Sequence, residues 1–264
     1  MALASMTPLG IGIVVLLCTF GGALLGIWLR AALPAHHLRD ESRDTVRLGI
    51  GLVATLTALV LGLVTASAKS SFDSLNTAIK DAAADIIATD RLLARYGPER
   101  KDIRTTLKRV VADRIEKTWS QGPSQTAKLD VTKATETGEW VVDQIRALTP
   151  PNEAQRSLQS RAVDQSESLL RARWVALGEL GTSIPWPFLI VLVFWLTITF
   201  MSFGLQAPAN TTVLAALLLC ALSVAGAVFL ILEMDGPFDG LIQVSAEPLR
   251  YALTRLGRED RAPL

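Results

Sequence analysis

Three acidic residues stand together at the end of an apolar run, where their side chains could support ion chemistry. Glu233, Asp235 and Asp239 lie within seven residues of one another, and carboxylate oxygens are the ligands that a hard cation such as Ca²⁺ prefers. The alternative is a plain turn, in which Gly236-Pro237 breaks a helix and Asp239 and Ser245 cap the next element. The sequence leaves both interpretations open, with a candidate calcium site at the three carboxylates.

The histidines and cysteines give weaker evidence for a metal-binding or catalytic site. The two histidines, His36 and His37, are adjacent, so on a helix they would point about 100° apart and would not bind one metal ion together. They form either a surface pair or a pH sensor. The two cysteines, Cys18 and Cys220, each lie inside an apolar run, which predicts packing rather than metal binding. Phosphate-binding glycine loops and nucleophile elbows are missing, so we predict that the protein is not an enzyme.

One apolar run, Leu48 to Ala68, is rich in small and hydroxyl-bearing residues. These are Gly49, Gly51, Thr55, Thr57, Gly62, Thr65 and Ser67. Small residues let membrane helices pack closely, and a run of this kind can also line a pore that controls conduction by width and wetting. Both roles are compatible if the helix packs around a central axis in an oligomer. The candidate pore-lining residues are Thr55, Leu59, Gly62, Leu63 and Ala66.

The elements that must position these residues are four apolar runs of about 20 residues, enough for a helix to cross the hydrocarbon core of a bilayer. They are Leu9–Leu29, Leu48–Ala68, Ile184–Leu205 and Thr212–Leu232. The first run lacks a basic segment before it, which favours an anchor over a signal peptide. None of the four has an ionisable residue in its interior, which disfavours a proton-driven pump or an ion-coupled transporter.

The predicted fold is therefore all-α: an integral membrane protein with two transmembrane hairpins and a central helical domain. The expected boundaries are 1–68, 69–183, 184–232 and a tail at 233–264. Apolar residues with helical spacing predict that the second span continues to Tyr96, where Gly97-Pro98 stops it. Further helices are expected before Gly122-Pro123, around Trp140–Leu148, and from Asn152 to Leu180. Pairs such as Asp113 and Lys117 predict a solvated helix face.

Charge distribution gives a topology and excludes one class of partner. The loop from Arg30 to Arg47 holds four arginines, against eight basic residues beside the other span ends and in the tail, so we expect cytoplasmic termini and a cytoplasmic central domain. The eight are Lys69, Lys80, Arg171, Arg173, Arg250, Arg255, Arg258 and Arg261. The formal net charge is only +1, which argues against nucleic acid as a partner.

The segment EMDGPFDGLIQVSAEPLRYAL, which begins at Glu233, resembles the C-terminal signature of the bacterial bestrophin-like membrane proteins. The two-plus-two arrangement of spans, the helix from Asp81 to Tyr96 and the Trp119 that follows a basic helix also fit that family. The chain departs from it in reading Asp81-Ala82-Ala83-Ala84 where Glu-Ala is expected. It also has no aromatic residue in the second span, and no run of consecutive acids after the fourth.

The resemblance implies a homo-oligomeric, pentameric anion channel of the bacterial inner membrane, with its pore along the second span and the lipid bilayer, inorganic ions and other copies of itself as partners. Two other classes stay open. A motor-stator or energy-transducing subunit shares the layout but needs a partner chain with an intramembrane acid. A non-conducting scaffold or sensor would bind other proteins through the helical domain. The channel function is inferred from the resemblance to this family and is therefore an analogy.

Overall fold

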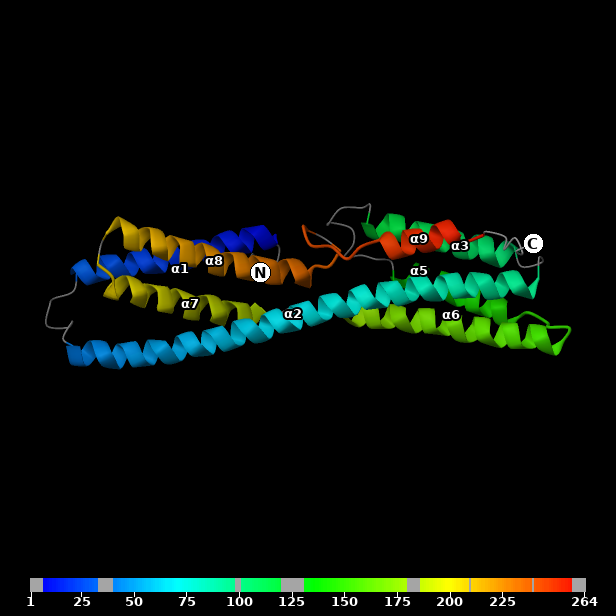
Figure 1. Ribbon diagram of the computed structural model, residues 1–264, viewed down its shortest axis with the longest axis horizontal. Coiled ribbons are helices and arrows are strands. Elements are labelled where there is room, and N and C mark those ends of the chain that lie inside the picture. Colours follow the sequence, from blue (N-terminus) through cyan, green and yellow to red (C-terminus); the bar gives the residue numbers. More distant parts are fainter. Residues whose placement is uncertain are drawn as a thin grey trace, which may run out of the picture. The chain divides into compact units, whose positions relative to one another are not determined.

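The computed structural model describes residues 7–32, 40–97, 101–119, 131–179, 186–208, 210–238 and 240–257, and only the backbone of 40–46, 131–137 and 172–179. Every regular element in these ranges is an α-helix (Figure 1). The helices are α1 (Pro8–Ala32), α2 (Asp40–Tyr96), α3 (Lys101–Trp119), α5 (Val131–Arg146), α6 (Glu153–Glu179), α7 (Trp186–Gln206), α8 (Thr211–Asp235) and α9 (Glu247–Arg255). The predicted all-α fold is confirmed.

Four of these helices, α1, α2, α7 and α8, are long and apolar enough to cross a membrane, which confirms the four predicted spans. The second span does continue without a break, because α2 is a single helix of 57 residues that ends at Tyr96. Gly97, which follows, has a φ of +153°, a backbone angle that favours glycine. Several predicted features lie outside the described residues: His36, His37, Pro98, Gly122-Pro123, Ile184 and Asp239.

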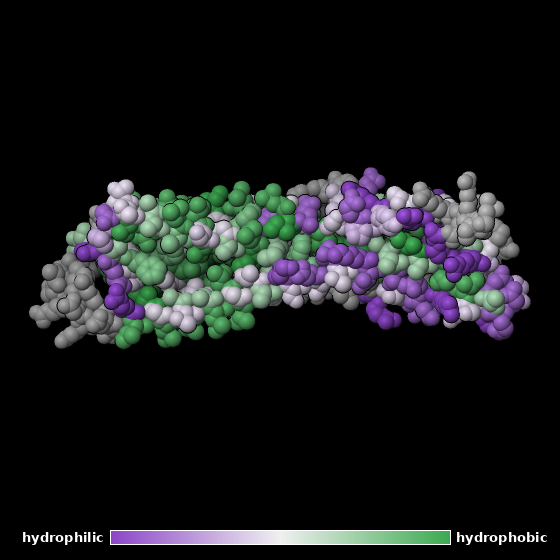
Figure 2. All heavy atoms as spheres, viewed as in Figure 1, coloured by the Kyte–Doolittle hydropathy of each residue, from purple (hydrophilic) through white to green (hydrophobic). Residues whose placement is uncertain are grey.

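The chain divides into two compact units, the first made of Met1–Ser70 and Ser183–Gly236 and the second of Ser71–Thr182 and Pro237–Leu264. In the first unit, α1 packs against both α7 and α8. Two apolar clusters lie between these three helices. Hydrophobic side chains cover the visible face of this unit, whereas the second unit shows mostly hydrophilic ones (Figure 2). That contrast is expected for a membrane unit and a water-exposed unit.

Glycines bring α1 and α7 unusually close together. Gly22 and Gly26 are four residues apart on α1, the spacing that lets membrane helices approach through their backbones. A Cβ atom built on Gly26 would lie 2.0 Å from the carbonyl oxygen of Met201, and one built on Gly204 would lie 2.0 Å from that of Ala23. At the end of this contact Arg30 donates to the carbonyl oxygens of Gln206 and Ala207, which caps α7 with a positive charge.

The second unit has its core along the part of α2 that extends past Ser70. One cluster joins α2 residues from Leu75 to Ile86 to α3 and to the segment around α9. A second cluster joins the end of α2 to α3, α5 and α6. The predicted stripe on α2 is therefore confirmed as the buried face of this helix. The predicted pair of Asp113 and Lys117 also forms, at 2.8 Å, and is exposed.

Local sequence sets the helix ends. The side chain of Asn152 accepts a hydrogen bond of 2.8 Å from the N–H of Gln155 and caps α6 after Pro150-Pro151. Asn210 caps α8 in the same way through Val213, also at 2.8 Å. The helix predicted around Trp140–Leu148 corresponds to α5 but ends earlier. α5 ends at Arg146, and Leu148 is buried in the turn that follows.

The close approach of α1 and α7 predicts that Gly26→Ala destabilises the protein. The added methyl group would overlap the Met201 carbonyl, and forcing extra atoms into a packed interface costs about 1–3 kcal/mol. Gly21→Ala on the same helix is the matched control, because nothing lies within 4 Å of the new atom. We expect a lower thermal midpoint in detergent for Gly26→Ala only. Equal midpoints would mean that the two backbones do not meet.

Candidate pore-lining helix and the turn after the last span

The membrane stretch of α2 is barely covered by its own chain. Only 6% of the residues in its most apolar window are buried, against 39%, 33% and 22% in α1, α7 and α8. The covered residues fall on one helical face. Thr57 and Ala68 are buried, and Val53, Leu61 and Val64 are partly buried. Leu61 makes its contact with the apolar cluster of α1, α7 and α8. Ala54 and Val60 on the same face are also partly buried, and most of the remaining surface of this stretch is exposed.

The five candidate pore-lining residues all lie on the uncovered side of α2. Thr55, Leu59, Gly62, Leu63 and Ala66 are exposed, with Leu59 and Leu63 at 60% and 62%. Their spacing of four, three, one and three residues places them on one stripe, opposite the face that holds Thr57 and Ala68. The structure therefore brings the five together on one surface, which no helix of the described part of the chain covers.

The three threonine hydroxyls in the membrane stretch of α2 are satisfied within the helix. The Oγ1 atoms of Thr55, Thr57 and Thr65 each donate to a carbonyl oxygen four residues earlier, at 2.9, 2.7 and 2.7 Å. A hydroxyl that donates to its own helix has no proton left for a passing ion or water. The exposed stripe consequently offers only methyl and methylene groups and weak acceptors, and its widest side chains are leucines.

The acidic turn after α8 is described only in part. Glu233 is 4% exposed, and both Glu233 and Asp235 make polar contacts, whereas Asp239 lies outside the described residues. Within the described part of the chain, His, Cys, Asp and Glu side chains form no group of three that could hold a metal ion. Because the third carboxylate of the candidate set is not among the described residues, the calcium site stays a prediction.

The described residues of the same segment show the geometry of a turn. The N–H of Val244 donates to the carbonyl oxygen of Pro237 at 2.9 Å, which closes the loop after α8. The Ser245 hydroxyl then accepts from the N–H of Glu247 at 3.1 Å, at the start of α9. Leu241, between them, is 84% exposed. The break at Gly236-Pro237 agrees with the turn interpretation. The predicted cap differs, because the N-cap of α9 is Ala246 without a side-chain cap hydrogen bond, and Ser245 stands one residue before it.

Two interactions in the second unit were not predicted from the sequence. Trp119 donates its indole N–H to the carbonyl oxygen of Val244 at 2.8 Å and meets the ring of Phe238 edge to face. Asp90 is buried and forms an ion pair with Arg104 at 2.8 Å. Asp90 falls four residues after Ile86 and three before Leu93, on the apolar stripe of α2. A carboxylate in that position requires a buried partner, so the sequence did hold a signal.

These features define a class: an all-α integral membrane protein with four membrane-spanning helices, one of them uncovered, and a helical domain built on an extension of that helix. A model of the bestrophin-like domain matches residues 17–249. The chain therefore belongs to the bestrophin-like family, as its C-terminal segment predicted.

Solved structures support the same fold. A crystal structure of a point mutant of a bacterial bestrophin homologue from Klebsiella pneumoniae aligns with a TM-score of 0.63 at 14% identity, over 92% of this chain and 97% of that one. A second crystal structure, of a point variant described as a membrane protein, aligns with a TM-score of 0.61 at 14% identity, over 94% and 99%. Curated proteins give no significant match.

Thiol labelling can decide which medium the uncovered face of α2 meets. In a chain whose Cys18 and Cys220 are replaced by alanine, Leu59→Cys should react with a charged, water-soluble thiol reagent in membranes, because the thiolate forms in water and not in lipid. Leu219→Cys on α8 is the matched control, since Leu219 is 64% exposed and Leu59 60%. We expect labelling of the α2 variant only. Equal resistance of both thiols would place α2 against lipid.

Proposed function

We propose that the protein is a homo-oligomeric ion channel, a pentamer whose axial pore is lined by α2 from each copy. The observation that carries the proposal is the uncovered membrane stretch of α2, of which only 6% is buried. Around a closed rotation axis each copy presents the same patch to the centre. The stripe of Thr55, Leu59, Gly62, Leu63 and Ala66 then lines the channel, while α1, α7 and α8 form its outer wall.

Passive conduction fits the chemistry of that stripe better than ion-coupled transport. Between Leu48 and Ala68, α2 carries no ionisable side chain, and proton relays and coupled transporters use intramembrane charge. Leucines without polar neighbours make a hydrophobic constriction, which controls conduction by wetting. Anion selectivity enters the proposal through the bestrophin-like family alone.

The proposal includes a location. The bestrophin-like domain and the four long apolar helices indicate a membrane location. We propose that this membrane is the bacterial inner membrane. The positive residues beside the second and third spans and in the tail favour cytoplasmic termini and a cytoplasmic helical domain.

Side-chain truncation on the pore stripe tests the function. In liposomes that contain the purified protein, Leu59→Ala and Leu63→Ala should each raise chloride flux severalfold, because removing a bulky apolar group widens the constriction and favours wetting. Leu219→Ala removes the same atoms from an equally exposed site on α8 and should leave the flux unchanged. Flux at background for the wild type and both leucine variants would refute the channel and favour a scaffold.

A further inference from the structure

A leucine that follows the last span by a few residues is almost fully exposed. Leu241 is 84% exposed, the highest value among the large hydrophobic side chains of the described residues. Leu48, in the membrane stretch of α2, reaches 78%. A single exposed leucine is common on protein surfaces, so the exposure gains meaning only from the loop that carries Leu241 and from the place of that loop in the chain.

The loop that carries Leu241 is closed by hydrogen bonds. At its base the N–H of Val244 donates to the carbonyl oxygen of Pro237 at 2.9 Å. At its tip the side-chain amide of Gln243 donates to the carbonyl oxygen of Gly240 at 3.0 Å. Gly240 has a φ of +92°, a backbone angle that favours glycine. Leu241 is therefore exposed on a loop with a defined conformation.

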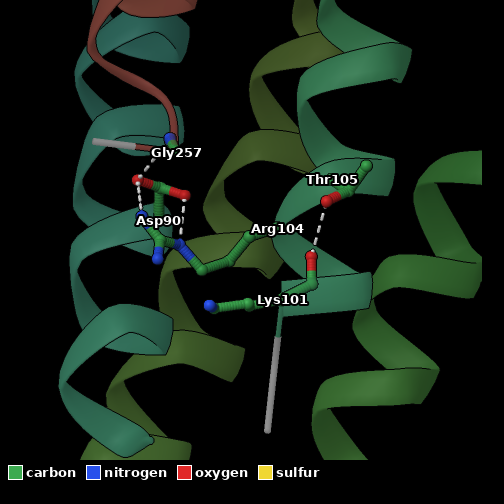
Figure 3. A network of polar contacts seen from close by, with 5 residues as sticks. All are labelled: Asp90, Lys101, Arg104, Thr105 and Gly257. Carbon is green, nitrogen blue, oxygen red and sulfur yellow. Dashed lines mark hydrogen bonds and ion pairs between the residues drawn. The ribbon is translucent and has the colours of Figure 1, made fainter. Parts of the chain in front are cut away.

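The residues on either side of this loop tip are held on the second unit. Phe238, before the tip, meets the ring of Trp119 edge to face, with the ring centroids 5.5 Å apart. After the tip, the segment is held as far as Gly257, whose N–H donates to the Oδ2 atom of Asp90 at 3.3 Å (Figure 3). Leu241 is left outside this packing, although residues before and after it take part.

Chain length places the loop at a membrane boundary. α8 has 25 residues and is therefore about 37 Å long, whereas the hydrocarbon core of a bilayer is about 30 Å thick. The loop begins one residue after Gly236, the cap of this helix, so its base at Pro237 and Val244 reaches the headgroup layer. Leu241 is three residues from Val244 and lies within about 11 Å of the base. The acyl boundary is within its reach.

We propose that the loop tip, Gly240–Gln243, is a membrane anchor: the side chain of Leu241 inserts between lipid headgroups in the leaflet at which α8 ends. The other side chains fit a headgroup environment. Gln243 and Ser245 are exposed, polar and uncharged, and Trp119 at the loop base is a residue type that is enriched at membrane interfaces. The anchor concerns the bilayer alone and does not depend on the proposed channel function.

The loop tip fits a bilayer better than it fits another copy of the chain. A stable contact between proteins buries about 800 Å² on each partner and surrounds its apolar anchors with further contacts that exclude water. Beside Leu241 the exposed residues are Gly240, Gln243 and Ser245, so the tip offers one large apolar side chain. A lipid surface accepts a single apolar side chain without a complementary pocket.

Spin-label accessibility in liposomes tests the anchor. In the full-length chain with Cys18 and Cys220 replaced by alanine, a nitroxide on Leu241→Cys should collide severalfold more often with oxygen, which concentrates in lipid, than with a water-soluble nickel chelate. Leu219→Cys on α8, where Leu219 is 64% exposed, is the lipid reference and should show the same preference. Lys108→Cys, at an exposed position of α3, is the water reference and should show the opposite one.

Two accessibility results would overturn the anchor. A label on Leu241→Cys that prefers the nickel chelate, as at Lys108→Cys, would place the loop in water. A label that neither reagent reaches would mean that protein covers the position.

Photo-crosslinking gives a second measurement with a side chain close in size to leucine. A diazirine analogue of leucine in place of Leu241 should form adducts with lipid in liposomes, detected by mass spectrometry. A crosslink to a second copy of the chain, or the absence of lipid adducts, would refute the anchor. The same analogue in place of Leu219 is the positive control for lipid adducts.

Discussion

The constraint on which the rest of the structure depends is the continuity of α2. From Leu63 to Tyr96 the sequence contains neither glycine nor proline, so nothing interrupts the backbone hydrogen bonds of the helix. The same helix must satisfy a bilayer in its first half and pack a water-exposed domain in its second half. Its sequence changes accordingly, from an uncharged apolar run to a stripe of buried residues with charged residues between them. The helix contributes a segment to each of the two units of the protein.

Within the membrane unit, the close glycine contact pairs α1 with α7 and leaves α2 without a closely packed partner helix. Because Gly22, Gly26 and Gly204 let the two backbones meet, these helices bury much of their small-residue surface against each other, and α8 packs on α1. The glycines of α2 meet no such partner among the described residues. A Cβ atom added to any of its glycines, Gly49, Gly51 and Gly62, would have nothing within 4 Å. Small residues usually mark a place where another helix packs closely. The exposed glycines of α2 are therefore understandable if a helix from another copy of the chain packs against them.

Much of the fold could be predicted because it follows from local patterns. Uncharged runs identify the spans, Gly97-Pro98 ends α2, and Asn152 begins α6 after two prolines. The candidate stripe on α2 also follows from helical spacing. The contact of Asp90 with Arg104 and Gly257 could not be derived in the same way. Arg104 and Gly257 are 14 and 167 residues away from Asp90 in the sequence. They reach it only because α3 and the segment around α9 pack on α2. The position of Asp90 on an apolar stripe indicates a buried partner but does not identify it.

The hydroxyl groups of α2 bear on how the protein would handle ions. Thr55 and Thr65 are exposed, yet each donates its proton to the helix backbone. A pore that replaced the hydration shell of an anion would need free donors at its narrowest point, because desolvating an ion without compensation is costly. Leu59 and Leu63 provide none. On the proposed channel function, an ion that passes this stripe would therefore keep much of its water, and the width of the leucine constriction would control whether it passes.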